Sequence, residues 1–139
     1  MGASEDSLGL LIGRVAKELS RAFDDVLAAA GGSAAVWQVL RALAAGEHRT
    51  QAELAAAIGV RQPTLTHHLD AMERAGLVAR DRQGRVQHVT VTESGEQLFL
   101  RLRRAAASFD GRLRAGLDDG EVAELRRLLA QLTENARPD

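Results

Sequence analysis

At 139 residues, with 45% apolar and 3% aromatic residues, the chain has the length of one domain whose core must be built largely from Ala and Leu. It contains no cysteine, which excludes disulfides, thiolate metal ligands and thiol redox sensing, and its net charge of −1 excludes a surface that is basic overall. The first residues lack the pattern of a signal peptide and no apolar run approaches the ~20 residues of a membrane span, so we expect a cytoplasmic protein with no membrane partner.

The first third of the chain predicts two helices. Apolar residues recur at three- and four-residue steps from about residue 6 to residue 30, which is the spacing of one apolar helix face. Gly31 and Gly32 follow as signals that end a helix. Ser33 is suited to cap a second helix, which we expect to stop at Gly46.

Residues 50–76 predict a helix, a tight turn and a second helix. Thr50 and Glu53 form a capping-box pattern, in which each side chain satisfies a free amide at the helix start. This short helix ends at Gly59, which suits a tight turn because it has no Cβ. The next helix starts near Gln62, with a proline in its first turn where the missing N–H does no harm, and runs to residue 75.

A hairpin and two further helices complete the predicted chain. Residues 77–80 and 85–91 alternate in the manner of strands, and residues 81–84 form the turn between them. Thr92 is suited to cap a fifth helix, and Asp118 or the next aspartate is suited to cap a last one. The predicted fold class is therefore mainly α with a small β-hairpin.

The order of these parts suits duplex DNA, because one helix can enter the major groove while a hairpin lies beside the backbone. The positive excess lies on the same segment, since residues 49–91 carry six Arg against four acidic residues, or +2. Gln62 and His67 are the candidates for base edges, because they place polar groups near the start of the helix. Thr64 and Thr66 are candidates for contacts with phosphate or a thymine methyl.

Arginines at the hairpin tip extend this candidate interface. Arg82 and Arg85 are candidates for phosphate or the minor groove, although arginines in a turn are also common as solvated charges. An antiparallel helix pair with a glycine turn also occurs without any role in DNA binding. The full set of candidate DNA contacts is Ser33, Thr50, Gln51, Arg61, Gln62, Pro63, Thr64, Thr66, His67, Arg80, Arg82 and Arg85.

Neither a metal site nor an active site is expected. The side chains of His67 and His68 point about 100° apart on a helix, so this adjacent pair cannot chelate one ion. The sequence holds no Gly-x-Ser-x-Gly elbow, phosphate-binding loop or His-Glu-x-x-His motif. We therefore expect no enzyme activity, no cofactor and no bound metal.

Several motifs together resemble those of one family of regulators. They are Gln51-Ala-Glu-Leu54-Ala, Ile58-Gly59, Gln62-Pro-Thr-Leu-Thr66, Met72-Glu73, Gly76-Leu-Val78, and Arg85 followed by Val89-Thr-Val-Thr92 and Gly95. With these motifs the chain resembles the MarR family of winged helix-turn-helix transcriptional regulators over nearly its whole length. It departs from the family in having Gln83 where an aspartate usually braces the wing arginine, in a shorter hairpin, and in having His68 at a usually apolar position.

The resemblance implies a sequence-specific DNA-binding regulator, here predicted to be a repressor that binds a palindromic operator as a homodimer and is released by a small, often aromatic, ligand. The family's ligand cavity lies between the dimerisation helices and the DNA-binding lobe. This implies Phe23, Trp37 and Phe99 as ligand-binding candidates, although ordinary packing explains them as well. Two alternatives remain open, namely a helical protein-interaction module and a metal-responsive repressor of the related ArsR type.

The terminal helices predict pairing of two chains. Residues 6–30 and 92–135 carry long apolar stripes that a lobe formed by residues 33–91 is too small to cover. Two copies with two-fold symmetry would cover these stripes and would place two reading helices about 34 Å apart, which matches a palindrome. We therefore expect one domain over residues 1–139, with a winged helix-turn-helix lobe at 33–91 and a dimerisation region at 6–30 and 92–135.

Overall fold

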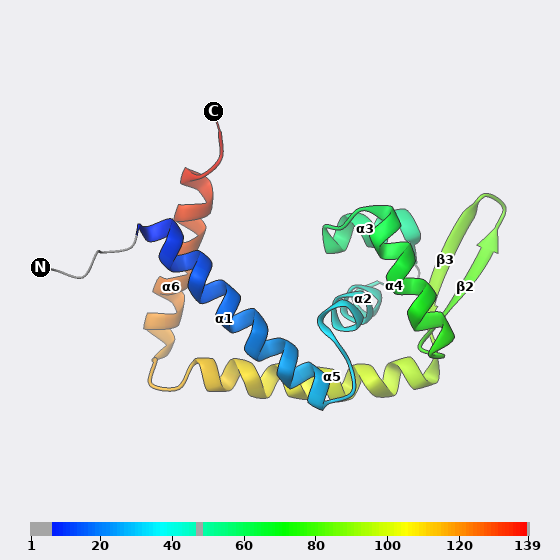
Figure 1. Ribbon diagram of the computed structural model, residues 1–139, viewed down its shortest axis with the longest axis horizontal. Coiled ribbons are helices and arrows are strands. Elements are labelled where there is room, and N and C mark those ends of the chain that lie inside the picture. Colours follow the sequence, from blue (N-terminus) through cyan, green and yellow to red (C-terminus); the bar gives the residue numbers. More distant parts are fainter. Residues whose placement is uncertain (1–6, 47–48, 139) are drawn as a thin grey trace, which may run out of the picture. The chain divides into compact units, whose positions relative to one another are not determined.

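The computed structural model describes residues 7–46 and 49–138, which form a mainly helical protein with a small β-sheet (Figure 1). The elements are α1 (Leu8–Ala29), α2 (Ala34–Ala44), β1 (Arg49–Thr50), α3 (Gln51–Ile58), α4 (Gln62–Arg74), β2 (Val78–Gln83), β3 (Val86–Val91), α5 (Glu93–Leu113) and α6 (Asp119–Asn135). The predicted fold class is confirmed, and the helices lie close to their predicted limits. Residue 6, the predicted start of the first helix, lies outside the described residues.

The chain divides into two compact units, residues 1–106 and residues 107–139, with the division inside α5. The limits drawn from the sequence, one domain with a lobe at residues 33–91, remain a prediction. Within the described residues no single helix is long and apolar enough to cross a bilayer, and α1 and α2 reach that composition only jointly, across a bend of 79°.

Leucine fills the core of the first unit, as the composition predicted. Helices α1 to α5 each contribute fully buried leucines, and β3 contributes one fully buried valine; these residues are Leu27, Leu40, Leu54, Leu65, Leu69, Leu102 and Val89. Such a core of branched aliphatic side chains allows short helices to pack closely around the sheet.

Local hydrogen bonds start the helices of the first unit at the predicted positions. Ser33 Oγ accepts from the Val36 N–H at 3.2 Å. Thr50 Oγ1 accepts from the Glu53 N–H at 3.1 Å, but the Glu53 carboxylate accepts from the Thr50 hydroxyl at 3.0 Å. The second half of the predicted capping box is therefore replaced by a side-chain bond. Gly59 closes α3 with φ +80°, the left-handed conformation predicted for this turn.

The sheet has the order β1-β3-β2, and all its pairs are antiparallel. The hairpin turn was predicted over residues 81–84 and this was wrong, because β2 continues to Gln83 and pairs with Val86. The turn has two central residues, Gly84 with φ +66° and Arg85, whose φ is not positive, which is the φ pattern of a type II′ turn. A polar residue can continue a strand where it is exposed to solvent, as Asp81 is. The two-residue strand β1 was not predicted, since it is too short to show alternation.

The start of α5 is held closely against the end of α4 and the start of β2. The Thr92 N–H donates to the Leu77 carbonyl at 3.0 Å and its hydroxyl donates to the Gly76 carbonyl at 2.5 Å. Thr92 Oγ1 also accepts from the Gly95 N–H at 3.1 Å, which confirms the predicted cap. A Cβ on Gly95 would lie 2.1 Å from the Leu77 carbonyl oxygen, so only glycine fits this approach.

The second unit consists of the end of α5 and α6. Asp118 Oδ1 accepts from the Glu121 N–H at 2.8 Å and the Glu121 carboxylate accepts from the Asp118 N–H at 3.0 Å, so Asp118 is the cap. Large apolar side chains of this unit are exposed; they are Leu113, Leu117, Leu125, Leu128 and Leu129.

Candidate nucleic-acid interface

Helix α4 has one buried face and one exposed polar face. Leu65 and Leu69 are fully buried and Met72 is nearly so, as the predicted apolar seam required. Gln62 and His67 are exposed, and so are Pro63 and Thr64 between them along the chain. The periodicity of a helix thus separates the core-facing residues from four of the candidate DNA contacts.

The junction of α3 with α4 contains a chain of hydrogen bonds. Gln51 Nε2 donates to Thr66 Oγ1 at 2.5 Å, and the Thr66 hydroxyl donates to the Gln62 carbonyl at 2.9 Å. Both side chains are half-buried, and Gln51 Oε1 is buried with no hydrogen-bond partner within the described chain. Two residues predicted to contact DNA, Gln51 and Thr66, therefore bind each other and hold α3 to the first turns of α4.

The guanidinium of Arg80 on β2 lies between two carboxylates of α4. Its NH2 group donates to Asp70 at 2.5 Å and to Glu73 at 3.2 Å, and its side chain is only 16% exposed. The Arg80 N–H also donates to Glu73, at 3.2 Å. The hydrogen bond from Arg80 is the main cause that holds the pKa of Glu73 below its usual value, and the same bond raises the pKa of Arg80.

Sequence reasoning grouped Arg80 with the DNA contacts and did not single out its partners. The sequence pattern that could have predicted this cluster is a pair of acidic residues, Asp70 and Glu73, one turn apart on one helix face, followed by an arginine on the next strand. In the structure this cluster joins the root of the hairpin to α4. It thereby holds the start of the hairpin to α4.

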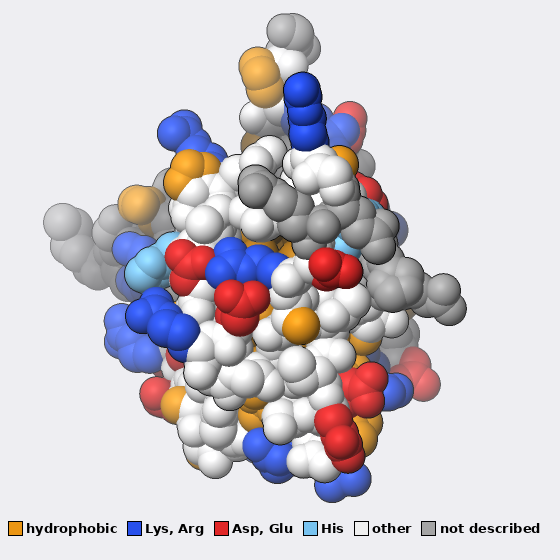
Figure 2. Space-filling view, turned by 90° about the vertical axis from the view of Figure 1, so that its right-hand side faces the viewer, with side chains coloured by type: hydrophobic (Ala, Val, Ile, Leu, Met, Phe, Trp, Pro, Cys, Tyr) orange, Lys and Arg blue, Asp and Glu red, His pale blue; other side chains and the backbone are white. Residues whose placement is uncertain are grey.

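Arg85 is exposed at the tip of the hairpin, as predicted, while the side chain of Arg82 lies outside the described part of the structure. Figure 2 looks onto the side of the molecule that carries the hairpin and shows basic and acidic side chains next to one another. On the side shown in Figure 2, the described basic side chains are therefore interspersed with acidic ones.

The remaining candidates lie around the start of α4 or at helix caps. Arg61 is exposed at the N-cap of α4, where its side chain makes no capping bond. Ser33 caps α2 and lines a small cavity of about 170 Å³ together with His67 and His68, so the fold brings Ser33 to the side of α4. Thr50 caps α3.

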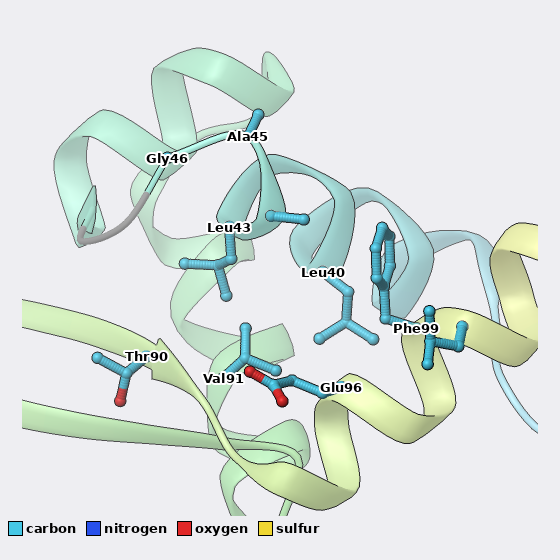
Figure 3. A pocket seen from close by; sticks show the side chains of 10 residues that line it. Leu40, Leu43, Ala45, Gly46, Thr90, Val91, Glu96 and Phe99 are labelled. Carbon is cyan, nitrogen blue, oxygen red and sulfur yellow. The ribbon is translucent and has the colours of Figure 1, made fainter.

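The three ligand-binding candidates are all half-buried against the core of the first unit. The rings of Trp37 and Phe99 stack with centroids 5.6 Å apart and planes 18° apart. Phe99 also lines a cavity of about 620 Å³ between α2, β3 and α5 (Figure 3), whereas Trp37 and Phe23 are not part of its wall. Within the described residues no group of three or more His, Asp or Glu side chains is placed to hold a metal ion, and the rings of His67 and His68 lie 6.0 Å apart.

Known proteins match this chain both in the segment from α2 to the hairpin and over nearly its whole length. A family model described as the MarR family matches residues 31–86, from the turn before α2 to the start of β3. The structure of a transcriptional regulator (MarR family) from Rhodococcus sp. RHA1 is similar over 95% of this chain and 96% of that one, with a TM-score of 0.80 and 25% identity. The chain belongs to the MarR family.

Two further solved structures of transcriptional regulators are similar to this chain over nearly the full length. Transcriptional regulator PA3341 is 31% identical with a TM-score of 0.76, covering 91% of this chain and 96% of that one. The transcriptional repressor CouR, bound to p-coumaroyl-CoA, is 27% identical with a TM-score of 0.82, and 96% of each chain is covered. The recognition drawn from the sequence motifs is thus confirmed: the protein is a MarR-family transcriptional regulator with a winged-helix fold.

Proposed function

We propose that this MarR-family chain binds duplex DNA by placing α4 in the major groove and the hairpin against the adjacent backbone. The observation that carries the proposal is the division of α4 into a buried face, with Leu65, Leu69 and Met72, and an exposed face, with Gln62 and His67. A helix held by its apolar face and free on its polar face can enter a groove without disturbing the core.

The exposed residues take different roles in this proposal. Gln62 and His67 read base edges, because their amide and imidazole groups carry donors and acceptors that match the major groove. Arg61 and Thr64 contact phosphate at the N-terminus of α4, where free amides also favour an anion. Arg85 contacts the backbone or the minor groove from the hairpin tip. We keep Ser33, Thr50, Pro63 and Arg82 as lesser candidates for contacts with DNA.

Three of the predicted contacts are better explained as support for the reading helix. Gln51 and Thr66 bind each other, and Arg80 donates to two carboxylates of its own chain. We propose that these residues set the position of α4 and of the hairpin and do not themselves read sequence.

We propose that the acting unit is a homodimer. Helix α1 exposes a stripe of large apolar side chains, Leu8, Leu11, Val15 and Leu19, at 39–56% exposure, and the second unit exposes five leucines. A stripe of exposed apolar side chains, as on α1, is characteristic of interfaces between proteins. A two-fold pair would present two α4 helices about one DNA turn apart, so its operator would be a palindrome.

The relative CouR is named as a transcriptional repressor bound to p-coumaroyl-CoA. By that likeness we propose that this chain also represses transcription and that a small ligand, aromatic in the first instance, changes its affinity for DNA. A ligand bound between the DNA-binding lobe and the helices that form the proposed dimer interface would change the distance between the two α4 helices of the dimer. The two helices would then no longer match the spacing of the operator half-sites. This role needs no catalytic chemistry, so we keep the expectation that the chain is not an enzyme.

The test is anisotropy with labelled duplexes, comparing DNA from upstream of the protein's own coding region with a shuffled duplex of the same composition. We expect the protein to prefer the upstream duplex. Gln62→Ala or His67→Ala should reduce the difference in binding free energy between the two duplexes by about 1–3 kcal/mol. Arg61→Ala should weaken binding to both duplexes and reduce the salt dependence. Gln97→Ala, an exposed polar residue on α5, is the matched control and should change neither. Binding with no preference among duplexes would favour the protein-interaction module instead.

A further inference from the structure

A cavity of the first unit, between α2, β3 and α5, has mainly apolar walls and one charged side chain. Its volume is about 620 Å³, within the range of about 300–1,000 Å³ typical of small-molecule sites. The wall includes Leu40 and Leu43 of α2, Val91 of β3, and Phe99 and Leu100 of α5, and Leu100 is 50% exposed. Of the described residues in the wall, Glu96 is the only charged one.

The Glu96 side chain is exposed and points from the first turns of α5 toward Val91 (Figure 3). Within the described part of the chain no side chain donates a hydrogen bond or pairs in charge with its carboxylate, in contrast to Glu73, which Arg80 neutralises. The other polar group of the wall, the Thr90 hydroxyl, donates to the Ala79 carbonyl at 3.5 Å. The carboxylate is therefore the strongest hydrogen-bond acceptor that the cavity offers.

We propose that this cavity binds an organic cation, a protonated amine attached to an apolar or aromatic body, with Glu96 as the counter-charge. Apolar walls favour the body of such a ligand. The Glu96 carboxylate is exposed, so an ammonium group can reach it and form a charge-assisted hydrogen bond. An aromatic acid is disfavoured at the same place because its carboxylate would approach Glu96. The effect of this ligand on DNA binding rests on the proposed function, whereas the binding of the ligand to the cavity does not.

The position of the cavity explains how such a ligand would act on the regulator. It lies where the end of α2, the end of β3 and the start of α5 meet. Strand β3 is the central strand of the sheet, and it forms the hairpin together with β2. A cation held between α5 and β3 would favour one position of the hairpin relative to α4, and DNA affinity would change with its occupancy.

Binding can be followed directly because Trp37 is the only tryptophan and the chain has no tyrosine. Its ring stacks on Phe99, which lines the cavity, so a ligand there should change the tryptophan fluorescence. The probes are 4-phenylbutylammonium, 4-phenylbutanol and 4-phenylbutyrate, which share one skeleton and differ in charge. At an ionic strength of about 0.15 M we expect the ammonium compound to bind about tenfold more tightly than the alcohol, and the carboxylate to bind most weakly.

Two matched substitutions test the role of Glu96. Glu96→Gln should reduce affinity for the ammonium probe about ten- to hundredfold and leave affinity for the alcohol unchanged. Glu93→Gln removes the same charge from the same first turn of α5 but lies outside the cavity wall, so it should leave both affinities unchanged. Ala44→Phe, at the exposed last residue of α2, should fill the cavity and weaken both probes together.

Titration calorimetry on the same samples gives a second readout, and all measurements use the whole 139-residue chain without DNA. The proposal is overturned if neither method detects the ammonium probe, if the butyrate binds as tightly as the ammonium compound, or if Glu93→Gln acts as Glu96→Gln does. Because no DNA is present, these outcomes are independent of whether the protein reads sequence.

Discussion

Arg80 on β2 donates from its guanidinium to the Asp70 carboxylate on α4, and the two residues link the hairpin to this helix. The arginine side chain is 16% exposed and the aspartate side chain 47% exposed, so the pair lies at the edge of the core and not in free solvent. Glu73, one turn further along α4, accepts from the same guanidinium. Breaking this cluster should disturb both stability and the geometry of DNA binding.

Arg80→Leu should lower the urea midpoint of unfolding, because it leaves the Asp70 and Glu73 carboxylates near each other without a counter-charge. It should also weaken binding to DNA, since the hairpin loses its anchor on α4. Arg127→Leu removes an arginine from an ion pair with Glu124, in which both side chains are more than half exposed, and should leave the midpoint unchanged. Equal effects of the two substitutions would contradict this interpretation.

The stability from the Arg80–Glu73 interaction should depend on pH. The interaction holds the pKa of Glu73 below its usual value of 4.5, so it stabilises the fold above that value and is lost as pH falls through the lower folded-state pKa. We expect the difference in unfolding free energy between the native protein and Arg80→Leu to be constant near neutral pH and to shrink below about pH 4.5. Urea unfolding of both proteins at pH 7 and at pH 3 measures it, and a difference that grows on acidification would count against the assignment.

Two glycines of α5 should respond oppositely to alanine. A Cβ at Gly95 would lie 2.1 Å from the Leu77 carbonyl oxygen, and backbone cannot give way cheaply, so Gly95→Ala should destabilise the fold by about 3 kcal/mol or more. Nothing lies within 4 Å of a Cβ at Gly111, so Gly111→Ala should stabilise by about 0.5–1 kcal/mol through helix propensity. Thermal and urea unfolding of both variants provide the comparison, and destabilisation by Gly111→Ala would show that α5 is packed there.

Thr66→Val should destabilise the junction of α3 and α4 by about 1–2 kcal/mol, because Gln51 Nε2 would lose its acceptor in a half-buried site. DNA affinity should fall with it, while Thr66→Ser, which keeps the hydroxyl, should restore both. Thr64→Val, on the exposed face of the same helix turn, is the control and should leave stability nearly unchanged. If Thr66→Ser binds DNA as poorly as Thr66→Val, the threonine methyl and not the hydroxyl matters, and Thr66 touches DNA itself.

The proposed dimer interface can be broken on α1. Leu11→Glu or Val15→Glu places a charge on the exposed apolar stripe and should convert the dimer to a monomer in sedimentation velocity, with loss of operator affinity. Lys17→Glu changes charge on the same exposed helix but roughly opposite the stripe, and should leave the dimer intact. A native protein that sediments as a monomer at micromolar concentration would remove the basis for the palindromic operator.

Local signals in the sequence were sufficient for most of the secondary structure. The caps at Ser33, Thr50 and Asp118 and the left-handed turn at Gly59 each depend on atoms no more than a few residues away, so pattern alone predicts them. The exposed polar face of α4 follows in the same way, from helical periodicity. The hairpin turn was misplaced because polar residues suit a solvated strand as well as a turn.

Only the tertiary structure decided which side chains meet across elements. Gln51 and Thr66 are 15 residues apart and Arg80 and Asp70 are 10 apart, and in each pair both members looked from the sequence like polar surface residues. Glu96 was unremarkable in the sequence and stands out only because the fold places it against apolar walls from α2 and β3. The physical reason is that a helix or a turn is stabilised by neighbours along the chain, whereas the role of a charged or polar group depends on its surroundings, which the packing of distant segments creates.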